Sequence, residues 1–103
     1  MSKYLYILSG PSLLPEIKII ATTRNLYGEI EYYECTYGGK MCCYYVESDK
    51  SEFFFKKLTE ILEREQCHIS GNFYKCSIDK IEPLIKEITG KSLINMSNYN
   101  LHM

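Results

Sequence analysis

The chain has 103 residues, which suits one domain and leaves no room for a second. Lysine and arginine number 12 and aspartate and glutamate 13, so a nucleic-acid partner would need a local basic face rather than the field of the whole molecule. No stretch approaches the roughly 20 apolar residues of a membrane span, and the N-terminal apolar run is too short for a signal peptide. We expect a non-membrane protein that is cytoplasmic or otherwise intracellular, in a cell or in an infected host.

The five cysteines are odd in number and include the adjacent pair Cys42 and Cys43, which makes a poor disulfide framework. Free thiols in a reducing compartment are the simplest interpretation. No CxxC pattern occurs, and Cys67 next to His68 is the only local hint of a zinc site. Buried structural thiols are therefore favoured over metal binding.

Residues 3–9 mix aromatic and branched side chains and stop at Gly10-Pro11, which predicts a strand followed by a turn. Residues 16–23 are again rich in β-branched side chains and predict a second strand. The two strands should pair antiparallel through a connection longer than a tight hairpin turn.

Residues 25–47 allow two interpretations. The segments on either side of Gly38-Gly39 could be the strands of a hairpin, or residues 26–34 could form a short, poor helix. Gly28 and the tyrosines count against the helix, because both residue types have low helix propensity.

A helix is predicted from residue 49 to about residue 65. Asp49 can cap its start with Glu52 three residues later. Its apolar side chains fall on one face, and they are Phe54, Leu58, Ile61 and Leu62.

A strand at residues 73–77 and a second helix opened by Ser77 or Asp79 are predicted next. Gly90 should end this helix, and Pro83 must lie in its first turns or kink it. Its apolar residues share one face, and they are Ile78, Ile81, Ile85 and Ile88.

The polar segment 91–103 could be frayed or could dock across the sheet. Together these elements predict an α+β fold with a small antiparallel sheet of three or more strands flanked by helices. We expect a single domain at residues 1–90 and a C-terminal tail at 91–103.

Five strings in this order resemble the GIY-YIG endonuclease family, particularly its bacteriophage and large-DNA-virus branch. They are YLYILSGPSLLPEIKIIATTR (4–24), YYVES (44–48), FFKKLTEIL (54–62), GNFYKC (71–76) and DKIEPLIKEI (79–88). The resemblance covers about residues 3–89. It implies a three-stranded antiparallel sheet flanked by helices, hydrolysis of DNA phosphodiesters with one divalent metal ion, and a viral or mobile-element origin.

The family's catalytic tyrosine corresponds to Tyr6, and the lysine usual in this branch to Lys18. Four other positions depart from the family. Ile20 replaces a glycine, which should crowd the approach of substrate. The catalytic arginine position holds Glu29, and the metal-binding glutamate position holds Phe55. A histidine position of the family, on the same helix as Phe55, holds Thr59.

If the chain is active, the catalytic candidates are Tyr6, Lys18 and Arg24, and the metal ligand for Mg²⁺ or Mn²⁺ is Glu52. The candidates for nucleic-acid contact are Lys18, Arg24, Lys56 and Lys57. Several of these candidates also have a purely structural explanation. Tyr6 can be a strand tyrosine that packs its ring. Glu52 can be a capping residue, and Lys56 and Lys57 can lie on a solvated helix face.

The favoured hypothesis is a catalytically degenerate GIY-YIG-like domain that works without a cofactor, as a binding or inhibitory module for a protein or DNA. The alternatives are a divergent metal-dependent nuclease, and a small inhibitor or immunity protein without nuclease ancestry. A carboxylate within reach of Tyr6 would favour the nuclease, and only Phe55 and Thr59 facing Tyr6 would contradict it. A hairpin across Gly38-Gly39, with no helix before residue 49, would favour the inhibitor.

Overall fold

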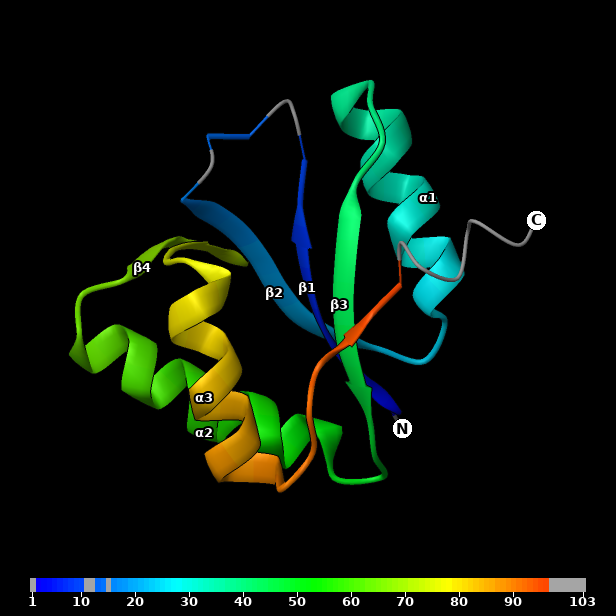
Figure 1. Cartoon of the computed structure of the whole chain (residues 1–103). Coiled ribbons are helices and arrows are strands. Elements are labelled where there is room, and N and C mark those ends of the chain that lie inside the picture. Colours follow the sequence, from blue (N-terminus) through cyan, green and yellow to red (C-terminus); the bar gives the residue numbers. More distant parts are fainter. Residues whose placement is uncertain (1, 11–12, 15, 97–103) are drawn as a thin grey trace.

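A computed structural model describes residues 2–10, 13–14 and 16–96 of the chain (Figure 1). In chain order its elements are β1 (Tyr4–Ser9), β2 (Ile17–Thr23), α1 (Leu26–Tyr37), β3 (Cys42–Glu47), α2 (Ser51–Arg64), β4 (His68–Ser70), β5 (Phe73–Lys75), α3 (Ile78–Thr89) and β6 (Ile94–Asn95). None of the helices in these residues is both long and apolar enough to cross a membrane.

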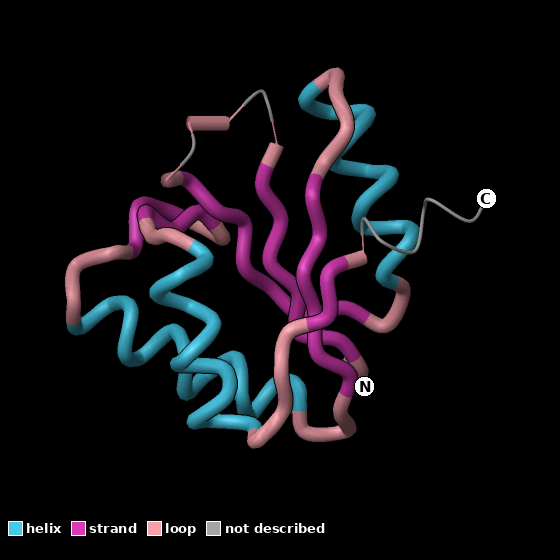
Figure 2. Tube along the Cα trace, viewed as in Figure 1, coloured by secondary structure: helices cyan, strands magenta, loops and turns pink. Residues whose placement is uncertain are grey.

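The strands form one antiparallel sheet in the order β4-β5-β2-β1-β3-β6. The predicted pairing of the first two strands is confirmed, with Tyr6 opposite Ala21. Helix α1 covers one face of the sheet, and α2 and α3 cover the other (Figure 2). The predicted α+β class, an antiparallel sheet flanked by helices, is therefore confirmed.

Strand β1 is buried on both faces. Leu5 and Ile7 belong to the cluster under α2 and α3, and Tyr6 and Leu8 to the cluster under α1. Successive side chains of a strand point to opposite faces, so these four consecutive residues supply both cores. Each is at most 1% exposed.

The hairpin interpretation of residues 25–47 is wrong, because α1 precedes β3. Asn25 caps the helix by accepting a hydrogen bond at 3.1 Å from the backbone N–H of Gly28. A Cβ on Gly28 would lie 2.8 Å from Asn25 Nδ2, so the glycine permits this cap. Gly38, with φ of 72°, closes the helix in the left-handed conformation.

Helix α2 starts differently from the prediction. Lys50, not Asp49, is its N-cap residue, and the helix has no side-chain cap. The predicted pairing of Asp49 with Glu52 is wrong, because Ser48 holds this turn by accepting from the Lys50 N–H at 3.0 Å. The predicted apolar face is confirmed by Leu58 and Leu62, which are fully buried.

Helix α3 follows the prediction closely. Ser77 caps it by accepting from the N–H of Lys80 at 3.2 Å, and Gly90 closes it with φ of 74°. Pro83 lies inside the helix, one turn after its start. Strand β5 ends at Lys75, two residues before the predicted end, and the short strand β4 was not predicted.

The C-terminal segment docks on the sheet as far as residue 96. In β6, Ile94 pairs with Tyr45, and the N–H of Met96 donates to the carbonyl of Cys43 at 2.8 Å. Met96 is buried in the α1-side cluster. The rest of the expected tail, residues 97–103, lies outside the described residues.

We expect the Leu62→Ala variant to lose about 3 kcal/mol of unfolding free energy in urea denaturation, because it leaves a cavity between α2 and the sheet. Phe53→Ala, on the same helix but 56% exposed, should cost less than about 1 kcal/mol. Equal losses would contradict the packing described.

The thiols should divide into two classes when titrated with an aromatic disulfide reagent. Cys35 and Cys42 are exposed, whereas Cys43, Cys67 and Cys76 are buried. Burial raises the pKa of Cys43 to about 12 and that of Cys76 to about 11, which leaves little thiolate at neutral pH. We expect two thiols to react quickly in the native protein and the other three only in denaturant.

Candidate functional site

Tyr6 is buried at the centre of the α1 face of the sheet, with 1% of its surface exposed. Its ring lies in the same cluster as Ile19, Ala21 and Leu26, and Tyr33 of α1 packs against that cluster. The ring therefore packs in the core, as the structural explanation for a strand tyrosine predicts. Only its hydroxyl group is left for chemistry.

The Tyr6 hydroxyl donates a hydrogen bond to Glu29 Oε2 at 3.3 Å. The second carboxylate oxygen, Oε1, accepts a longer hydrogen bond of 3.5 Å from Thr23 Oγ1. Thr23 is held in turn by the backbone N–H of Asn25, which donates to Thr23 Oγ1 at 3.0 Å. Glu29 thus accepts hydrogen bonds from a side chain of β1 and from one at the end of β2.

The surroundings of Tyr6 oppose its deprotonation. Burial raises the pKa of the phenol well above its ordinary value, and the neighbouring Tyr33 and Glu29 raise it further. A general base must lose its proton near the working pH. Tyr6 therefore stays a neutral hydrogen-bond donor, which does not suit the activation of a water molecule.

Lys18 lies on the other face of the sheet. It is 4% exposed and points to the same side as Ile20, two residues along β2, whose side chain belongs to the cluster under α2 and α3. Its positive charge lowers the pKa of Cys76, although burial outweighs that effect. The Ile20 side chain points into this core, on the face of the sheet away from Tyr6.

Helix α2, which should carry the metal ligand, also covers the face away from Tyr6. Glu52 is exposed there, and Phe55 packs against the cluster of Leu5 and Ile7. Neither Phe55 nor Thr59 faces Tyr6. In the described part of the chain, no three His, Cys, Asp or Glu side chains gather to hold a metal ion. The residues present do not fit the one-metal site that the resemblance implies.

Arg24 lies just beyond β2, at the end of the sheet where β3 also ends. It lines a pocket of about 310 Å³ together with Tyr4, Tyr27 and Tyr45. Tyr4 and Tyr45 meet edge to face, with ring centroids 5.8 Å apart. The structure thus separates Arg24 from Lys18, which lies near the other end of β2 and on the opposite face.

Lys56 and Lys57 are exposed on α2. The ammonium group of Lys57 lies 5.5 Å from the centre of the Phe53 ring. Glu52 and Glu60 stand one helical turn before and after Lys56, so acidic and basic side chains alternate on this surface. The four predicted nucleic-acid contacts do not form one basic face.

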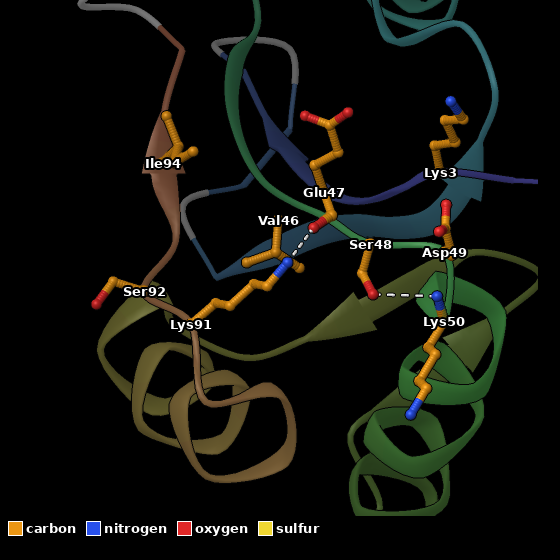
Figure 3. Close-up of a pocket in the computed structure, with 9 residues that line it drawn as sticks. All are labelled: Lys3, Val46, Glu47, Ser48, Asp49, Lys50, Lys91, Ser92 and Ile94. Carbon is orange, nitrogen blue, oxygen red and sulfur yellow. Dashed lines mark hydrogen bonds between the residues drawn. The ribbon is translucent and has the colours of Figure 1, made fainter.

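A larger pocket, of about 650 Å³, lies at the same end of the sheet as Arg24 (Figure 3). Its charged lining residues are Lys3, Glu47, Asp49, Lys50 and Lys91. Sequence reasoning missed this group, because the lysines come from segments far apart in the chain. It also missed the contact between Tyr6 and Glu29, which depends on α1 being a helix.

The Tyr6→Phe variant should lower the free energy of unfolding by about 1 kcal/mol at neutral pH, because Glu29 loses a donor. The folded protein keeps the Tyr6 proton at a pH where the unfolded chain releases it, so this stabilisation is complete below about pH 10 and is lost as the pH rises. We therefore expect the wild type to lose stability more steeply than Tyr6→Phe above about pH 10 in urea denaturation.

Both proteins keep the buried thiols of Cys43 and Cys76, so the difference between the two pH curves reports Tyr6 alone. Parallel curves would show that the phenol is not shielded as described.

Comparisons of the chain with protein-family models, with curated proteins and with solved structures found no match.

Proposed function

We propose that this protein is a binding module on a GIY-YIG-like scaffold and that it does not hydrolyse phosphodiesters. One observation carries the proposal: the Tyr6 hydroxyl is buried and donates to Glu29. The family's arginine at this position would neutralise charge that builds on a phosphate, whereas a carboxylate repels it.

The order β1, β2, α1, β3, α2 supports the scaffold part of the proposal. The resemblance implies a three-stranded antiparallel sheet flanked by helices, and β2, β1 and β3 pair antiparallel between α1 and the α2–α3 pair. The helix before residue 49 also removes the hairpin that would favour an inhibitor without nuclease ancestry.

A protein partner is better supported than a nucleic acid. Helix α1 carries Glu29, Glu31 and Glu34 but no lysine or arginine, so the surface of this helix repels phosphates. The same helix exposes Tyr27 and Tyr32 by 56% and 61%. Tyrosine is enriched in protein–protein interfaces. The five free thiols favour an intracellular location for this binding.

The alternative of a metal-dependent nuclease has one observation in its favour. Glu29 is a carboxylate within reach of Tyr6, which is the feature that would support activity. Against it, Lys18 and Glu52 lie on the other face of the sheet, so they cannot join Tyr6 and Glu29 around one phosphate.

Incubation of the purified protein with supercoiled plasmid and Mg²⁺ or Mn²⁺ should leave the plasmid intact, because the described residues place no group of metal-ligating side chains beside Tyr6. The nicked and linear forms are measured on a gel, with Tyr6→Phe and Glu29→Gln as matched variants. Metal-dependent cleavage that disappears in Tyr6→Phe would overturn the proposal and establish the nuclease.

A further inference from the structure

The 650 Å³ pocket lies where three parts of the chain meet: the residues just before β1, the turn from β3 into α2, and the segment that leads into β6. Lys3, Lys50 and Lys91 each come from a different one of these parts (Figure 3). The three lysines are far apart in the sequence, so no single helix or strand brings them together. The pocket is therefore a product of the fold rather than of local sequence.

The three ammonium groups do not converge on one point. Lys91 Nζ donates to the backbone carbonyl of Glu47 at 2.6 Å, whereas the Lys50 side chain points away along α2 (Figure 3). Lys3 lies on the far side of Glu47 from Lys91 (Figure 3). A compact anion would need several donors aimed at the same place, and this spread suits negative charges distributed along an extended chain instead.

The rest of the lining is mixed. Glu47 and Asp49 lie between the lysines, and Ile94 is 47% exposed at the β6 side of the pocket. A nucleic-acid strand carries one phosphate on every nucleotide, and some of these phosphates would have to lie against the two carboxylates. A peptide can place neutral or apolar side chains opposite Glu47 and Ile94 and carboxylates opposite the lysines.

We infer that this pocket docks an extended acidic segment of a protein partner, which binds the ammonium groups of Lys3, Lys50 and Lys91 and packs an apolar side chain on Ile94. The inference rests on the proposed binding function and names the partner's chemistry. Charge complementarity across such a surface sets specificity and association rate, and the apolar contact slows dissociation.

The test measures fluorescence anisotropy with a short fluorescein-labelled peptide in which glutamate and leucine alternate. We expect saturable binding to the full chain at low salt, and about tenfold weaker binding to the double variant Lys3→Glu/Lys50→Glu. The double variant Lys40→Glu/Lys75→Glu makes the same change of charge at two exposed lysines outside the pocket. It should bind the peptide as the wild type does.

Thermal melts of each variant show whether it is folded, and Ile94→Ser tests the apolar contact without a change of charge. Three outcomes would overturn the inference: no saturable binding, equal weakening by both double variants, or tighter binding of an oligothymidylate than of the peptide. The last outcome would assign the surface to nucleic acid. A peptide that fails to bind while the plasmid stays intact removes this inference and leaves the proposed absence of hydrolysis in place.

Discussion

The burial of β1 on both faces is the constraint on which the rest of the structure depends. Leu5 and Ile7 need cover on one side and Tyr6 and Leu8 on the other, so neither α1 nor the α2–α3 pair could be lost without exposing part of the central strand. With β1 at the centre, β2 and β3 become its neighbours and the shorter strands fall to the edges. These four consecutive residues thus join the two cores through the central strand.

The same division into faces separates the residues of the predicted catalytic set. The sequence pattern predicts which strand a residue belongs to. Whether its position along that strand is odd or even decides which of the two cores its side chain enters. Tyr6 enters the α1 core, while Lys18 and Ile20 enter the α2–α3 core. Residues that look like parts of one catalytic set in an alignment therefore lie on opposite sides of a sheet. Beside Tyr6 lies Glu29, and the hydrogen bond between them joins β1 to α1.

Strong local patterns made much of the fold predictable. These patterns depend on residues close in sequence: the aromatic and branched side chains of β1, the β-branched side chains of β2, the apolar faces of α2 and α3, and the Ser77 and Gly90 caps. The sequence left helix α1 open against a hairpin, because its tyrosines and Gly28 oppose a helix by propensity, while tertiary packing of Ile30 and Tyr33 overrides that preference. The site was less predictable, since contacts such as Tyr6 with Glu29 and the gathering of Lys3, Lys50 and Lys91 exist only after distant segments meet.

The strand order also bears on how the protein is made. Strands β1 to β3 and helix α1 all lie within residues 4–47, so most of the α1 side can assemble while the ribosome is still adding α2. On the opposite face of the sheet, Leu5, Ile7 and Ile20 stay exposed to solvent until α3 has emerged from the ribosome, because Ile81 and Ile85 complete the core that buries them. A half-synthesised chain therefore presents an apolar sheet surface to the cell, the kind of surface that aggregates or recruits chaperones. Variants truncated within α3 should therefore aggregate, even though they keep strands β1, β2 and β3.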